Sequence, residues 1–145
     1  MTELPRWLPL ANRFVRLLNR ANLRLGTIRV LTVPGRVSGK PRSTPVSPLR
    51  VAGERYVVAG LTNAQWAANV RAAGRGTLAH GRQTERVRLT EVRDPETRRK
   101  VMRAFPTEVP GGVPFFVQLG LVSRGDPDEF AAAADRVAVF TVHKE

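Results

Sequence analysis

Residues 34–45 read PGRVSGKPRSTP, and the rest of the chain can be understood outward from this acid-free stretch. It holds three cations, Arg36, Lys40 and Arg42, together with two glycines, three prolines and three hydroxyl side chains. Apolar runs at 28–33 and 46–51 lie on either side, which indicates a loop between two strands.

A basic loop that contains glycine suits a phosphate or another polyanion. Backbone amides can approach such a ligand closely, and arginine can donate paired hydrogen bonds to its oxygens. A solvated hairpin loop in a generally basic protein is the alternative, and the residues alone favour neither. The stretch is not a P-loop, because no GK[ST] sequence opens a helix here.

Composition predicts one globular domain spanning residues 1–145, with 42% hydrophobic residues. The absence of cysteine excludes disulfides and thiolate chemistry. The two histidines, His80 and His143, lack the paired spacing of a zinc site, so no metal is expected.

The net charge of +12 implies an anionic partner, either nucleic acid, a phosphorylated small molecule or an acidic membrane surface. A genome that favours arginine codons would raise the charge as well. No apolar run approaches the roughly 20 residues of a membrane span. We therefore expect a cytoplasmic protein, with peripheral attachment at the inner face of the cell membrane as a further hypothesis.

Residues 1–26 are predicted to form an N-terminal amphipathic helix that ends at Gly26. Its apolar residues recur at spacings of three and four, and Arg13, Arg16, Arg20 and Arg24 fill the opposite face. Such a helix can lie on anionic lipid or pack against its own domain, and we favour packing.

The remaining pattern alternates short strands and helices. Strands are predicted at 27–33, 45–52, 55–60, 75–80, 84–92 and 136–142, and helices at 64–73, 94–105 and 126–134, with an apolar segment at 113–121. Pro48 indicates a break or bulge within the second strand. This order predicts an α+β protein built on a small antiparallel barrel.

The motif GRxSGKPRxTP, followed by a hairpin and a Trp-x-x-Asn helix, resembles the deazaflavin (F-420)-dependent nitroreductase family over residues 27–92. The resemblance implies a flavin-reductase-like split β-barrel with N-terminal and peripheral helices. It also implies an oxidoreductase that uses the deazaflavin coenzyme F-420, with flavin mononucleotide as the rival cofactor.

This coenzyme resembles a flavin head joined to a phosphodiester and a polyglutamate tail, so it is strongly anionic. By resemblance, the phosphate and tail lie along Arg36, Ser38, Gly39, Lys40 and Arg42. The head is expected to contact Thr44, Pro45, Val46, Ala59, Gly60, Leu61, Trp66 and Asn69. Val37 stands where relatives commonly carry lysine, which removes one cation. Judged without the resemblance, Trp66 indicates a core anchor.

The apolar segment 113–121 is expected to be a lid in which Phe115, Phe116 and Leu119 shelter a planar substrate, although a plain core helix fits equally well. No nucleophile motif is present, so we expect no catalytic side chain and assign the chemistry to the cofactor. The lid offers no acid, and the single tyrosine, Tyr56, lies in a predicted strand. Quinones are therefore expected ahead of nitro compounds and enones.

Three functions remain open at this point. The first is hydride transfer from reduced F-420 to a hydrophobic conjugated acceptor such as a quinone, enone or nitro compound. The second is a carrier of coenzyme or fatty acid with the same fold. The third, a basic nucleic-acid-binding barrel, is disfavoured because the few aromatic residues are not interleaved with cations. The sequence leaves both monomer and homodimer open.

Overall fold

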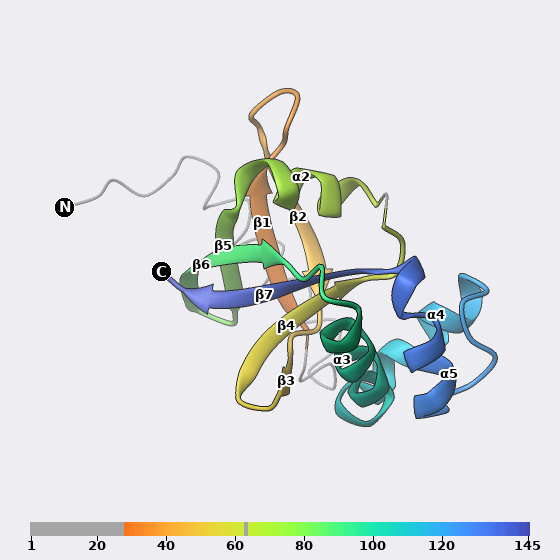
Figure 1. Cartoon of the computed structure of the whole chain (residues 1–145). Coiled ribbons are helices and arrows are strands. Elements are labelled where there is room, and N and C mark those ends of the chain that lie inside the picture. The colour runs from red at the N-terminus through yellow and green to blue at the C-terminus, as the bar shows by residue number, and fades with distance from the viewer. Residues whose placement is uncertain (1–27, 63) are drawn as a thin grey trace.

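The two edge strands of the sheet are adjacent in sequence, and this connection explains the shape of the protein. The computed structural model describes residues 28–62 and 64–145. In this part of the chain, seven antiparallel strands run in the order β2-β1-β5-β6-β7-β4-β3. Only Ser47 and Pro48 separate the end of β2 from the start of β3. The sheet must therefore curl until its edges meet, which makes a split barrel (Figure 1).

Five strands lie within two residues of their predicted bounds, whereas the predicted strand 45–52 is replaced by β2 and β3. The strand bounds are β1 Arg29–Pro34, β2 Pro41–Val46, β3 Leu49–Val51, β4 Glu54–Ala59, β5 Arg75–His80, β6 Gln83–Glu91 and β7 Ala138–Lys144. The break at Pro48 is confirmed, since β2 and β3 are separate strands. In β6, Val87 and Leu89 are buried whereas Arg86 and Arg88 are exposed, as the alternation predicts.

The helices also follow their sequence signals. They are α2 Gln65–Ala73, α3 Pro95–Glu108, α4 Val113–Gln118 and α5 Pro127–Ala132, with short 3-10 turns η1 Pro110–Gly112 and η2 Ala134–Arg136. Gly74 ends α2 in the left-handed conformation at φ 68°. Asp94 caps α3 by accepting a hydrogen bond from the Thr97 amide at 3.1 Å. Helix α3 was predicted to end at residue 105 but continues to Glu108. Pro106 is tolerated because it stands in the last turn, where few backbone hydrogen bonds remain to be lost.

Two hydrophobic clusters divide the core. One fills the barrel beneath α2 and contains Leu31, Val57, Val87 and Phe140. The other lies between the sheet and helices α3, α4 and α5, where Phe105, Phe116 and Phe130 meet. Figure 1 shows α2 above one end of the barrel and α3, α4 and α5 together at the other side.

The basic loop is shorter than predicted. Strand β2 begins at Pro41, so the turn covers only residues 35–40, and Arg42 and Thr44 lie on the strand. The sequence suggested a longer loop because prolines normally interrupt strands. Pro41 and Pro45 are tolerated here because β2 is an edge strand, where a missing N–H group removes no bond to a second neighbour. The predicted helix within residues 1–26 lies outside the described residues.

One arginine links the helical layer to the sheet. Arg98 of α3 donates from Nη1 to the Val92 carbonyl at 3.1 Å and from Nη2 to the Ala134 carbonyl at 2.8 Å. It also donates to the Val137 carbonyl. These acceptors lie after β6, in η2 and before β7, so a single guanidinium group connects three segments.

We expect Arg98→Ala to destabilise the fold by about 2–3 kcal/mol, because hydrogen bonds to a charged group contribute roughly 1.5–3 kcal/mol and several are lost here. Urea unfolding followed by circular dichroism measures the change. Arg99→Ala, which removes an exposed arginine one position along α3, is the matched control and should be nearly neutral. Equal effects of the two substitutions would contradict this role for Arg98.

Candidate functional site

The basic turn is held in shape by its own backbone. The Gly35 amide donates to the Lys40 carbonyl at 2.7 Å, and the Gly39 amide donates to the Gly35 carbonyl at 2.9 Å. Gly39 adopts φ 75°, which few other residues accept without strain. The Ser38 hydroxyl accepts from the Lys40 amide at 3.2 Å. The turn is thus solvent-exposed but held in one shape by hydrogen bonds of its own backbone.

Helix α2 fixes the direction of Arg36. The Asn69 side-chain oxygen accepts from the Arg36 backbone amide at 3.1 Å and from Arg36 Nη1 at 2.9 Å. Gln65 Oε1 accepts from Arg36 Nη2 at 2.8 Å. Asn69 is buried, with 6% of its surface exposed. Both acceptors are uncharged amides, so they orient the guanidinium group without neutralising its charge.

Gln65 is a residue that the sequence reasoning missed. It lies four positions before Asn69, and residues at this spacing share one face of a helix. A helix over residues 64–73 and a binding role for Asn69 were both predicted, and together they would have placed Gln65 at the same site.

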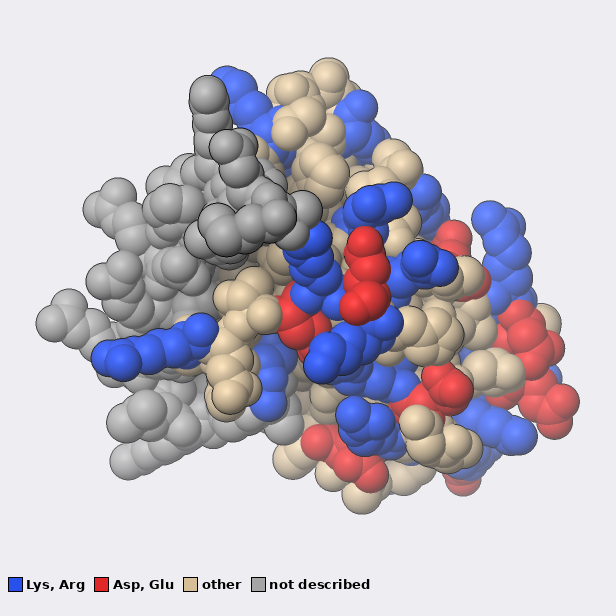
Figure 2. Space-filling model, turned by 90° about the vertical axis from the view of Figure 1, so that its left-hand side faces the viewer, with Lys and Arg blue, Asp and Glu red and all other residues tan. Residues whose placement is uncertain are grey.

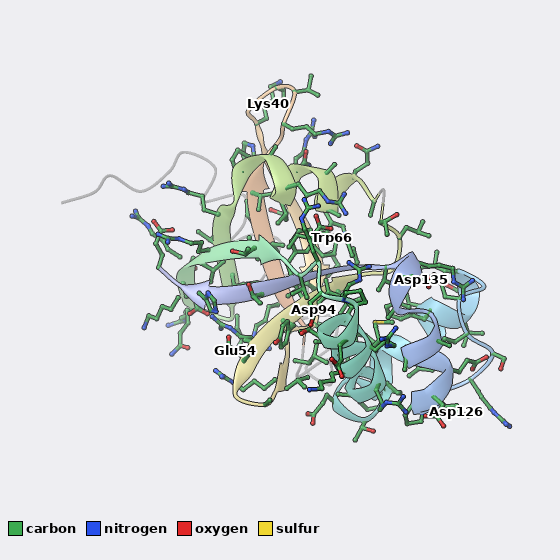
Figure 3. The ribbon with its side chains drawn as sticks, in the orientation of Figure 1. Lys40, Glu54, Trp66, Asp94, Asp126 and Asp135 are labelled. Atoms are coloured by element: carbon green, nitrogen blue, oxygen red, sulfur yellow. The ribbon has the colours of Figure 1, made fainter. Side chains whose placement is uncertain are left out.

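A groove of about 490 Å³ opens between the turn, β2 and α2. It is lined by Arg36, Val37, Ser38, Arg42, Ser43, Thr44, Gln65, Trp66 and Asn69. These described lining residues include no acid. Lys40 lies at the tip of the same turn, and Trp66 reaches from α2 toward the sheet (Figure 3).

The three cations of the turn region lack acidic partners within residues 28–62 and 64–145. The ion pairs of this part of the chain involve other residues, and none of them includes Arg36, Lys40 or Arg42. The groove therefore carries positive charge that the described protein groups around it do not balance. An anion is the complementary ligand.

The predicted head-binding residues occupy different environments. Thr44 and Trp66 are half-buried and line the groove, and the Trp66 ring lies 6.1 Å from that of Phe140. Val46 and Ala59 are buried in the barrel cluster against which Trp66 packs, so their side chains belong to the core. Pro45 is exposed on β2 and does not line the groove.

Gly60 and Leu61 lie away from this groove, at the end of β4, where α4 approaches. A Cβ atom on Gly60 would come within 2.5 Å of Leu119 Cδ1 and 3.0 Å of Phe115 Cε2. The glycine thus allows close contact between the end of the strand and α4. Leu61 and Phe115 are 43% and 54% exposed, so an apolar surface is available beside this contact.

Of the three predicted lid residues, Phe116 belongs to the core. Only 3% of its surface is exposed, and its ring lies 4.8 Å from that of Phe105 and 5.4 Å from that of Phe130. Phe115 and Leu119 are one helical turn apart and lie nearest to Gly60, whereas the Phe116 ring, which comes within 3.6 Å of a Cβ atom placed there, is buried. We therefore assign Phe116 to packing, and substrate contact remains a prediction for Phe115 and Leu119.

Arg71 connects the segment before α2 to the sheet. Its Nη1 donates to the Thr62 carbonyl at 2.7 Å, while Nε and Nη2 contact the two carboxylate oxygens of Glu91 at 2.9 and 2.8 Å. The hydrogen bonds from Arg71 are the main cause that lowers the pKa of Glu91, and the charge of Arg71 adds to the effect.

Because the pKa of Glu91 is lowered by folding, its stabilising effect is present above its unfolded pKa of about 4.3 and is lost as the pH falls through the folded value. We expect Glu91→Gln to cost on the order of 1 kcal/mol at pH 7 and progressively less below pH 4. Urea unfolding at several pH values measures this convergence. Glu108→Gln, which alters an exposed carboxylate on α3, is the control, and a stability difference between Glu91→Gln and wild type that stays constant with pH would refute the linkage.

Charge elsewhere on the surface is mixed. On the face shown in Figure 2, acidic side chains lie among the lysine and arginine side chains. The described residues of this face therefore do not form the continuous basic surface that phosphate-backbone binding requires. Among the described residues, no three His, Asp or Glu side chains are grouped to hold a metal ion, and no helix is long and apolar enough to cross a bilayer.

Solved structures with this architecture confirm the predicted fold. An F420-H2 dependent reductase (FDR-A) is 21% identical with a TM-score of 0.54, and the match covers 81% of this chain and 94% of that one. A domain-swapped dimer is 20% identical with a TM-score of 0.56, covering 94% and 97%. A putative pyridoxamine 5'-phosphate oxidase from Listeria innocua is 11% identical with a TM-score of 0.55, covering 94% of each chain. No curated protein matches the sequence significantly.

The curled antiparallel sheet, the peripheral helices and these likenesses define a split-barrel protein of the flavin-reductase-like class. A model of the F420H(2)-dependent quinone reductase family matches residues 13–111. The chain belongs to this family. This result confirms the resemblance to deazaflavin-dependent reductases that the sequence motif indicated. The protein is accordingly an oxidoreductase whose coenzyme is F-420.

Proposed function

We propose that this protein transfers a hydride from reduced F-420 to a hydrophobic conjugated acceptor, and that a quinone is the preferred acceptor. The observation that carries the proposal is the basic groove between the turn and α2, whose described residues include no acid. Family membership supports the coenzyme, and the groove supplies a place for its anionic part.

The residues of the groove fit the chemistry of the coenzyme. A phosphodiester and a glutamate tail need cations and amide donors, which Arg36, Lys40, Arg42 and the turn backbone can provide. A volume of about 490 Å³ lies within the usual range of about 300–1,000 Å³ for small-molecule sites. Half-buried Trp66 offers an apolar wall at the inner end. We propose that the head lies between this wall and the lid.

When bound, the coenzyme supplies the hydride chemistry, and the protein orients the reactants. Arg36 is fixed before binding by Asn69 and Gln65, so little ordering cost remains when an anion arrives. Leu61, Phe115 and Leu119 provide an apolar surface that can exclude water from a planar acceptor. The described lining residues of the groove offer no carboxylic acid as proton donor. We propose that solvent supplies the proton, which favours acceptors whose reduced form is a stabilised anion.

We expect Arg42→Ala to weaken F-420 binding roughly ten- to a hundred-fold, equivalent to about 1.5–3 kcal/mol for a hydrogen bond to a charged group. Fluorescence titration with coenzyme of different tail lengths measures the affinity. Arg99→Ala is the control, since it removes the same charge outside the groove. Arg98 is unsuitable as a control because it stabilises the fold.

Equal weakening by Arg42→Ala and Arg99→Ala would show that attraction is diffuse and that the groove is not the binding site. An affinity for flavin mononucleotide equal to that for F-420 would count against the coenzyme-specific assignment.

We expect Phe115→Ala to lower the rate of quinone reduction several-fold while changing coenzyme affinity little, because Phe115 is exposed on the face of α4 toward Gly60. Steady-state kinetics with a short-chain quinone and a nitroimidazole measure this effect and test the order of acceptors. Val117→Ala is the control, since it alters another partly exposed residue of the same helix. A preference for the nitroimidazole, or unaltered rates in Phe115→Ala, would overturn the proposed acceptor site.

Three further hypotheses concern the domain organisation, the N-terminal helix and the oligomeric state. The single domain of residues 1–145 and the membrane contact of the N-terminal helix are inferred from sequence, and the helix lies outside the described residues. The homodimer is supported by a similar structure described as a domain-swapped dimer.

A further inference from the structure

A second groove lies at the opposite end of the barrel from the proposed coenzyme site. Its volume is about 680 Å³. It is lined by Arg29, Pro48, Leu49, Arg50, Arg55, Leu78, His80, Gln83, Thr84, Glu85 and Lys144. None of these residues lines the groove beside the turn. We call it the rim groove.

The antiparallel topology brings the lining residues of the rim groove together. Arg29 begins β1, Arg55 lies near the start of β4, and Lys144 ends β7. Because neighbouring strands are antiparallel, these three strand ends lie at the same end of the barrel. The coenzyme groove lies at the other end of the barrel, since the turn follows Pro34 at the far end of β1. At about 3.3 Å per residue, the length of β1 separates the two ends of the barrel by roughly 16 Å.

Positive charge is concentrated in the rim groove. Four cationic side chains, Arg29, Arg50, Arg55 and Lys144, line it, and Glu85 is the one acid among the described lining residues. Glu85 is already engaged, because its two oxygens accept from Arg55 Nη1 and Nη2 at 2.6 and 3.2 Å. Arg50 and Lys144 form no ion pair with another described residue, so the groove carries an excess of positive charge even without counting Arg29.

The strand register itself places like charges together. Arg50 of β3 and Arg55 of β4 are directly opposite each other in the antiparallel ladder. Like charges in this arrangement are unfavourable. Burial and the charge of Arg55 lower the pKa of Arg29, which is a second sign of crowded cations. A bound anion would relieve this repulsion.

We propose that the rim groove is a second anion-binding site, which takes a small molecule bearing a multiply charged phosphate group. The half-buried Arg55 is held by Glu85, while exposed Arg50 and Lys144, which form no ion pair with another described residue, supply the cations that contact the ligand. A volume of about 680 Å³ accommodates a ligand of nucleotide size. This site does not depend on the proposed acceptor chemistry.

Calorimetric titration with inorganic pyrophosphate tests the site, using protein saturated with F-420 so that the coenzyme groove is filled. The double substitution Arg50→Ala/Lys144→Ala should raise the dissociation constant at least tenfold. Both side chains are exposed, so the variant is expected to fold, which circular dichroism verifies. Arg99→Ala/Lys100→Ala removes one exposed arginine and one exposed lysine from α3 and is the matched control, expected to bind as wild type does.

Three results would overturn the proposal. The saturated wild-type protein could fail to bind pyrophosphate, the two double variants could lose affinity equally, or Arg42→Ala alone could abolish binding. The last result would assign the anion to the coenzyme groove. Unchanged F-420 affinity in Arg50→Ala/Lys144→Ala, alongside lost pyrophosphate binding, would show that the two sites are separate.

Discussion

The two-residue connection between β2 and β3 constrains the whole molecule. Both strands lie at sheet edges, and a chain of two residues spans only about 10 Å from one strand end to the next. The seven strands must therefore curl into a barrel whose seam closes at Ser47 and Pro48. The curled sheet brings the ends of alternate strands together at the two ends of the barrel. Each end carries one of the two basic grooves, so the topology places both sites before any side chain is considered.

The coenzyme site depends on uncharged groups that hold a charged one. If an acid held Arg36, an ion pair would offset much of the attraction for an anionic ligand. Asn69 and Gln65 instead hold the guanidinium group with amide oxygens, at 2.9 and 2.8 Å, and leave its charge in place. Elsewhere in the described chain, Arg71 is paired with the carboxylate of Glu91, and Arg98 is held by backbone carbonyls within the fold. Arg36 differs from Arg71 because its partners are uncharged, so its charge remains available to an anionic ligand.

Local signals in the sequence predicted most of the fold. Alternation identified β6, the Asp94-Pro95 pair identified the start of α3, and Gly74 marked the end of α2. These signals depend on neighbouring residues, so one sequence reveals them. The extent of β2 depends instead on its position at a sheet edge, where prolines are harmless, and local pattern could not show this. The burial of Phe116 has the same origin, because contacts with Phe105 and Phe130 decide which of two adjacent phenylalanines faces inward.

The site residues that belong to the family motif could be predicted from the sequence. The hydrogen bonds that join residues on distant elements of the fold could not. Arg36, Arg42 and Asn69 were named from the motif and line one groove, but the clamp between Arg36 and Gln65 joins residues 29 positions apart. The rim groove shows the limit more clearly. Arg50 and Lys144 carry no motif and lie far apart in the sequence, on β3 and β7, and only the strand register places them around one cavity. The net charge of +12 indicated an anionic partner, but the barrel topology divides the groove cations between two separate sites.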